Sequence, residues 1–167
     1  MNNKRLARGA LLIALALALQ SLRLVIPLPP LVSTFVIGSL VHMMLALSLR
    51  LGSLAIALLL ALLLPLSAYL QGQVLLPFLI PVIWLGNALF VYLLQLFSAN
   101  RKLTLLLPPL AKAVLMGVAA WCVVNIVALP NPALRKTIMF AMSVPQLVTA
   151  VIGILLARQV MLRLRKI

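Results

Sequence analysis

The segment LTLLLPPLAKAVLMGVAAWCVVNIVA, residues 103–128, is the clearest indication of how this chain folds. Nearly all of its side chains are apolar, and Lys112 is its one charged residue. A helix that crosses the hydrocarbon core of a bilayer needs about 20 such residues. The segment is therefore long enough to span a membrane, and Pro108-Pro109 lies in its first half.

The rest of the chain has the same character. It is 66% hydrophobic and 8% charged, whereas a soluble domain is about half apolar and about a quarter charged. We predict an all-α polytopic membrane protein, a six-transmembrane-helix bundle that forms a single integral membrane domain over residues 1–167. The spans are predicted at about 9–26, 31–49, 53–70, 74–97, 103–128 and 137–157.

Two boundaries between these spans stay open. Residues 51–53 form either a tight turn or a kink within a longer helix. Residues 27–35, which begin with Pro27-Leu28-Pro29-Pro30, either connect two spans or re-enter the membrane. Proline ends the first run in both cases, because it cannot continue a helical hydrogen-bond ladder.

The basic residues orient the predicted bundle. Six spans place both termini on one side, together with most of the basic residues: Lys4, Arg5, Arg8, Arg50, Arg101, Lys102, Arg158, Arg163, Arg165 and Lys166. The other side carries only Arg23, Arg135 and Lys136. Because loops rich in Lys and Arg stay in the cytoplasm, we expect both termini to be cytoplasmic.

The chain contains no Asp or Glu, which excludes several classes of function. Catalysis by paired carboxylates, a carboxylate Ca²⁺ or Mg²⁺ site and an HExxH zinc site all need these residues. A single histidine, His42, cannot form a bis-histidine haem site. We therefore expect that the protein is not an enzyme and that it has no metal site and no resident cofactor. The basic residues lie between apolar runs and are not clustered on a polar fold. We therefore expect them to orient the protein in a lipid bilayer and not to bind nucleic acid.

Four polar side chains lie near the middle of four different predicted spans: His42, Asn87, Lys112 and Gln146. Polar groups are costly in hydrocarbon and normally face the interior of a bundle or a cavity. Their similar depth therefore predicts one shared cavity. Interhelical hydrogen bonding explains Asn87 and Gln146 equally well, and His42 is either a satisfied hydrogen-bonding group or a ligand contact.

Lys112 has no side-chain carboxylate partner anywhere in the chain. Three arrangements are open for it. The amine is neutral because it is desolvated, it reaches water along its flexible stem, or its counter-ion comes from an anionic ligand or a partner protein. Trp84 precedes Asn87 by three residues, and its ring either packs in the core or offers a stacking surface to a flat ligand.

Small residues recur in the first span. Ala10, Ala14 and Ala18 are spaced by four, and small residues at this spacing let another helix approach closely. The stripe serves either packing inside the bundle or docking of a separate membrane subunit.

Several short motifs carry a family resemblance. They are KRLARGA at 4–10, LGNAL at 85–89, AKA at 111–113 and PQLVTA at 145–150, the last followed by Gly153. With these motifs, the chain length and the predicted topology, the chain resembles the substrate-binding S components of energy-coupling factor (ECF) transporters.

The resemblance implies a bundle in a prokaryotic cell membrane that binds a vitamin, cofactor precursor or metal from outside. A membrane coupling subunit and two cytoplasmic ATPase subunits complete such a transporter. Ala10, Ala14 and Ala18 match the family's stripe that meets the coupling subunit. The implied ligand-binding positions are Trp84, Asn87, Lys112 and Gln146, with Arg23 and Gln71 nearer the mouth.

Two departures bear on the substrate. The N-terminus, Met1-Asn2-Asn3, lacks the histidines expected of metal-specific members, which disfavours a nickel or cobalt substrate. An acid-free chain favours an anionic or amide-rich organic solute over a cation. The alternative to solute capture is a membrane anchor or assembly subunit of a larger complex with no ligand of its own. A small pore or self-contained facilitator is a further alternative.

Overall fold

The computed structural model describes residues 3–74 and 76–164, and every regular element within them is helical. The elements are α1 (Asn3–Val25), α2 (Pro30–Leu47), the π-helical turn η1 (Ser48–Gly52), α3 (Leu54–Leu70), α4 (Leu79–Leu96), α5 (Arg101–Ile126), α6 (Pro132–Ala141) and α7 (Val144–Leu164). This confirms the predicted all-α class. The basic residues Arg165 and Lys166 lie outside the described residues.

Five segments are long and apolar enough to cross a membrane. They are the apolar part of α1, α2 together with η1, α4, α5 and the segment that joins α6 and α7. Helix α3 is also apolar but has only 17 residues. The chain is therefore a multi-pass membrane protein built from six apolar segments.

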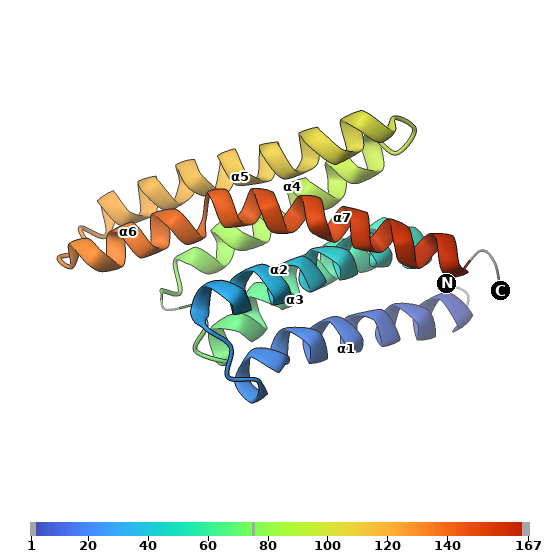
Figure 1. The fold of residues 1–167 in the computed structure, drawn as a ribbon, viewed down its shortest axis with the longest axis horizontal. Helices are drawn as coiled ribbons and strands as arrows, with labels where there is room; N and C mark the ends of the chain where they lie inside the picture. Colours follow the sequence, from blue (N-terminus) through green and yellow to red (C-terminus); the bar gives the residue numbers. More distant parts are fainter. Residues whose placement is uncertain (1–2, 75, 165–167) are drawn as a thin grey trace.

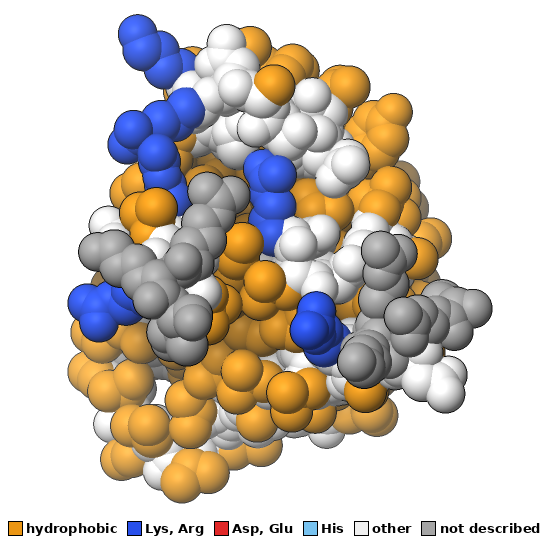
Figure 2. All heavy atoms as spheres, turned by 90° about the vertical axis from the view of Figure 1, so that its right-hand side faces the viewer, with side chains coloured by type: hydrophobic (Ala, Val, Ile, Leu, Met, Phe, Trp, Pro, Cys, Tyr) orange, Lys and Arg blue, Asp and Glu red, His pale blue; other side chains and the backbone are white. Residues whose placement is uncertain are grey.

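The helices form one bundle, in which α2, α3 and α7 lie between α1 and the α4–α5 hairpin (Figure 1). The start of α1, the end of α7, η1 and the α4–α5 connection lie at the same end (Figure 1). Figure 2 views this end and shows Lys and Arg side chains gathered on it. We call it the basic end, and the basic side chains described on it are Arg8, Arg50, Arg101, Lys102, Arg158 and Arg163.

Local chemistry resolves the two open boundaries. Helix α2 begins at Pro30, the first helical position, where proline loses no hydrogen bond. The segment before it connects two helices. At residues 51–53, η1 ends and the Ser53 side chain accepts a hydrogen bond from the N–H of Ile56 at 3.3 Å. This N-cap starts α3 as a separate helix.

The fourth helix begins at Leu79, five residues after the predicted start at 74. Pro77 disfavours a helical conformation for the residue before it, so the chain turns before α4 begins. Pro81 lies within the first turn of α4. The N–H that it lacks has no partner inside a helix at that position, and Pro81 is therefore tolerated there.

The predicted last span, 137–157, is two helices and not one. Helix α6 ends at Ala141 and α7 begins at Val144. Pro145 lacks the N–H that would donate to the carbonyl of Ala141 in a continuous helix. The side chain of Gln146 takes that place, because its Nε2 donates to the Ala141 oxygen at 3.1 Å. The Gln146 side chain thus provides a hydrogen bond to a carbonyl oxygen that the helix break leaves without its backbone partner.

Apolar side chains fill the bundle in two clusters. The larger one is built around Met44, Leu45, Leu60 and Phe90, and joins α1, α2, α3, α4 and α7. The smaller one contains Leu79, Val124 and Ile138 and lies toward the end opposite the basic end. A group of buried polar side chains lies at mid-bundle, on α2, α4 and α5.

Candidate functional site

The side-chain amine of Lys112 lies in the interior of the bundle, where helices α2, α4 and α5 meet. Its Nζ donates to Oδ1 of Asn87 at 2.6 Å and lies 2.5 Å from Nε2 of His42. All three side chains are buried, and only 1% of Lys112 is exposed. We call these three residues the buried triad. The arrangement of Lys112 that reaches lipid headgroups or water along its stem is therefore wrong.

The hydrogen bonds of His42 define its tautomer. Its Nδ1 lies 2.7 Å from the carbonyl oxygen of Gly38, one helical turn earlier. A carbonyl accepts only, so Nδ1 carries a proton and donates to it. Nε2 is then free to accept from Lys112. In this arrangement the His42 ring is neutral, because a second proton on Nε2 would face the N–H of Lys112.

An aromatic ring completes the surroundings of the pair. The ring of Phe90 meets the His42 ring edge to face, with 5.3 Å between centroids and 86° between planes. Nζ of Lys112 lies 5.7 Å from the Phe90 centroid, within the range of a cation–π interaction. Phe90 was not among the predicted site residues. Its place three residues after Asn87 on α4 is the signal that indicates it in the sequence.

Glycines let the helices that carry the triad approach closely. A Cβ on Gly153 of α7 would lie 2.4 Å from Cβ of His42 and 2.8 Å from the backbone nitrogen of Met43. A Cβ on Gly86 of α4 would lie 2.5 Å from Cγ of Met116, one turn after Lys112 on α5. All three distances are shorter than ordinary contacts of a Cβ atom. Gly153 meets backbone atoms of α2, so the close approach of α7 to His42 depends on glycine there, whereas at Gly86 the flexible Met116 side chain would have to move.

The structure brings three of the four mid-span polar residues together and leaves the fourth apart. His42, Asn87 and Lys112 form the triad. Gln146 hydrogen-bonds to the backbone of its own helix break. None of the four residues lines either of the two pockets described below, so the expected shared cavity stays a prediction. Trp84 and Asn87 also separate, since Trp84 is 38% exposed and Asn87 is buried. The Trp84 ring therefore lies on the outer surface of α4.

The predicted mouth residues Arg23 and Gln71 lie near the end opposite the basic end. Nε2 of Gln71 donates to Oγ of Ser21 at 2.8 Å and ties the end of α3 to α1. Gln20 adds a second link of this kind through Oγ of Ser67, at 3.0 Å. Arg23 is half-buried, and its Nε has no hydrogen-bond partner among the described residues. These contacts build a separate polar patch between α1 and α3.

The alanine stripe lies on the outside of the bundle. Ala10, Ala14 and Ala18 are all exposed on α1, whereas Gly9 and Ala16 face the interior. Packing inside the bundle is therefore not the role of this stripe. The exposed face of α1 is left without a covering helix in the single chain.

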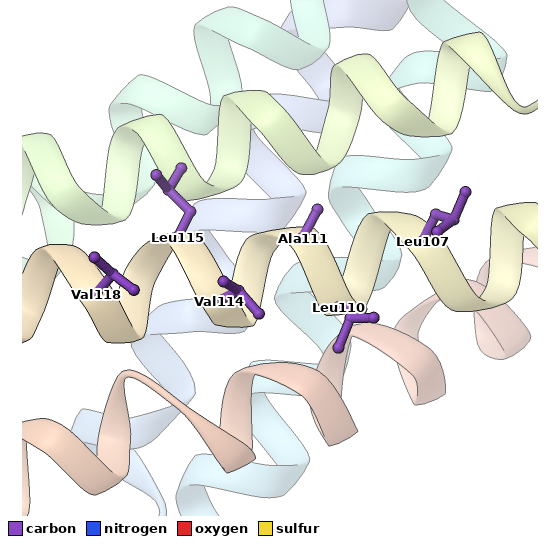
Figure 3. Close-up of a pocket in the computed structure, with 6 residues that line it drawn as sticks. All are labelled: Leu107, Leu110, Ala111, Val114, Leu115 and Val118. Carbon is purple, nitrogen blue, oxygen red and sulfur yellow. The ribbon is translucent and has the colours of Figure 1, made fainter.

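A shallow apolar groove runs along the outer face of α5 and has a volume of about 550 Å³. Figure 3 shows its six lining side chains, which all belong to α5: Leu107, Leu110, Ala111, Val114, Leu115 and Val118. None of them carries a polar atom. The groove can contact hydrocarbon, but it offers no hydrogen bond to orient a polar solute.

The chemistry of the buried triad suits an anion or an amide. A charged lysine has three N–H donors, and the two contacts above use two of them. The described residues supply no carboxylate, because the chain has no Asp or Glu. No family model, curated protein or solved structure matches the chain.

Proposed function

We propose that this protein is the membrane-embedded substrate-capture subunit of an ATP-driven importer of the ECF type. Its solute is a small organic micronutrient, anionic or rich in amides. The buried triad carries this proposal: Nζ of Lys112 is held inside the bundle by two neutral partners, Asn87 and His42. In the proposal this amine carries a positive charge. An anionic solute would supply the counter-charge that the side chains of this protein lack.

The energetics favour an external anion. A buried cation without a counter-charge is costly in a low-dielectric interior. An anionic group that reaches Nζ of Lys112 offsets this cost, and a charge-assisted hydrogen bond is about twice as strong as a neutral one. Asn87 and His42 hold the ammonium in place beforehand, so less ordering of the side chain is needed when the solute binds.

The exposed alanines support a partner in the membrane. Ala10, Ala14 and Ala18 form a smooth stripe on the uncovered face of α1, and such a face allows a close helix–helix contact. A coupling subunit on this face, with two cytoplasmic ATPases, would supply the work of transport. The chain would reorient against that subunit and open its triad toward the other side.

The orientation of the bundle belongs to the same proposal. The basic end faces the cytoplasm under the positive-inside rule, and the start of α1 and the end of α7 lie at this end (Figure 1). The solute then enters from the opposite end, where Arg23 and Gln71 lie. The smaller apolar cluster, on α4, α5 and α6, lies toward that end and would have to open to admit the solute.

Native mass spectrometry of the gently solubilised protein tests the proposal. We expect a co-purified small molecule on the wild type and its loss in Lys112→Met. The control is Lys102→Met, which removes the same charge from an exposed position at the basic end. A folded wild type that never retains a solute, and binds none from a panel of organic micronutrients, would count against capture.

The second candidate is an anchor or assembly subunit without a ligand. The observation that favours it is the hydrogen bonding of Lys112, which is already satisfied twice inside the bundle. In that case the triad only fastens α2, α4 and α5. Calorimetry separates the candidates, because an anchor subunit gives no heat of binding with any solute that matches the triad.

A further inference from the structure

A pocket of about 430 Å³ opens at the basic end of the bundle. Its lining comes from the α2–η1 junction, the α4–α5 connection and the C-terminal half of α7, and none of the triad residues belongs to it. Three arginines line it, one each from η1, α5 and α7: Arg50, Arg101 and Arg158. Three separate elements thus bring positive charge to one hollow.

The three guanidinium groups favour the binding of an anionic group in this pocket. Arg50 and Arg101 are exposed and Arg158 is half-buried, so all three can be reached. The chain has no side-chain carboxylate that could pair with them. The planar guanidinium donates two parallel hydrogen bonds to phosphate more readily than a lysine does. The charged part of the pocket therefore fits a phosphate group.

The remaining lining is mostly apolar. Leu155 and Leu162 are exposed, and they lie three residues before and four residues after Arg158. This spacing places them on the same face of α7. On a membrane-spanning helix, exposed leucines contact acyl chains. A free phosphate ion would satisfy the arginines only, whereas a phosphate joined to a hydrocarbon chain satisfies both parts of the lining.

We propose that this pocket binds the phosphate headgroup of an anionic phospholipid, with an acyl chain along Leu155 and Leu162. Basic pockets between membrane helices on the cytoplasmic side bind anionic headgroups in this way. The headgroup would bridge η1, α5 and α7 and hold the basic end together. This lipid site is separate from the buried triad, and it stands whether or not the triad binds a solute.

Lipid titration of the purified full chain in neutral detergent, read by native mass spectrometry, tests the proposal. The probes are phosphatidylglycerol and phosphatidylcholine with identical acyl chains. We expect the wild type to bind phosphatidylglycerol roughly tenfold more tightly or better. Glycerol 3-phosphate at the same concentration should not displace it, because it lacks the chains.

Two triple variants locate the site. R50Q/R101Q/R158Q should weaken phosphatidylglycerol binding roughly 10- to 100-fold. The matched control, R8Q/K102Q/R163Q, removes the same charge from the same end, and its three positions do not line the pocket. It should keep most of the wild-type affinity, because charges farther from the headgroup are screened.

Three results would overturn the lipid site. One is an equal loss of binding in both triple variants, which would show a diffuse charge effect. Another is full displacement by glycerol 3-phosphate, which would show a site for the free phosphate compound. The third is a wild type with no preference between the two lipids, as expected if the arginines serve an acidic protein partner. The third result is measured on the wild type alone, so it can be obtained even if one of the triple variants fails to fold.

Discussion

Lys112 and Asn87 are separated by 25 residues in the chain, yet Nζ of the lysine lies 2.6 Å from Oδ1 of the asparagine. The α4–α5 hairpin brings them together, and Gly86 lets the two helices approach at this level. His42 of α2 completes the contact from the other side. The bundle therefore holds a lysine amine at its centre with two neutral hydrogen-bond partners.

A double-mutant cycle measures the coupling between these two residues. Asn87→Leu leaves the buried ammonium with one acceptor fewer, and we expect a loss of about 1.5–3 kcal/mol in the free energy of unfolding. Lys112→Met removes the buried charge itself and should cost less. The double variant should be more stable than Asn87→Leu alone. Thermal unfolding in detergent gives the values, and strictly additive effects would show that the contact contributes no coupling.

The tautomer of His42 can be read directly, because it is the only histidine in the chain. We expect ¹⁵N NMR of histidine-labelled protein to show a protonated Nδ1 and an unprotonated Nε2 at neutral pH. Lys112→Met should shift the Nε2 resonance and leave Nδ1 nearly unchanged, since Gly38 still accepts its proton. A protonated Nε2 in the wild type would contradict the hydrogen bonding described for the triad.

Gly153 is expected to tolerate no side chain. Gly153→Ala would place a Cβ 2.4 Å from Cβ of His42 and force α7 away from α2. We expect a loss of about 1–3 kcal/mol in stability. The control is Gly117→Ala on α5, whose added Cβ would meet Ser143 only at 3.9 Å. The control should be neutral or should gain about 0.5–1 kcal/mol, because alanine favours a helix; equal losses would contradict the close α2–α7 contact.

The alanine stripe on α1 is expected to matter for assembly and not for folding. Ala14→Leu should block co-purification with the coupling subunit and its ATPases, because it roughens the face that they would contact. Solute affinity of the isolated chain should not change. Ala55→Leu, at an exposed position on α3, provides the control. Co-purification that survives Ala14→Leu would place the partner on another face.

Cysteine labelling tests the orientation. In a Cys122→Ser background, Pro130→Cys lies in the α5–α6 connection and Ala99→Cys lies in the α4–α5 connection. An impermeant maleimide should label residue 130 on intact cells, and residue 99 only after the membrane is opened. The reverse pattern would place the basic end outside and refute the cytoplasmic termini.

Much of the fold was predictable from local chemistry. An apolar run of sufficient length has to satisfy its backbone hydrogen bonds internally in a membrane, so it forms a helix. The all-α class and the positions of most helices follow from that rule. The split of the last span was missed, because Pro145 lies within an apolar run that looks continuous by hydropathy. Only the backbone shows that Gln146 closes the break.

The candidate site was predictable in part. Depth along a helix indicates which polar residues share a level of the membrane, and this placed His42, Asn87, Lys112 and Gln146 together. Only the first three meet in the structure. Depth alone does not give the rotation of a helix about its axis. Trp84 and Asn87 looked like neighbours by spacing, but α4 turns one to the outside and the other to the interior.

By itself the sequence determined that this protein lies in a membrane, that its segments are helical and that no Asp or Glu side chain is present to pair with its basic residues. Those properties depend on composition and on local hydrogen bonding. Tertiary packing decided which polar groups meet, that the alanine stripe faces outward and that three arginines share one pocket. These depend on the rotation and close approach of helices, which are set by contacts such as that of Gly153 with His42, between residues far apart in the chain.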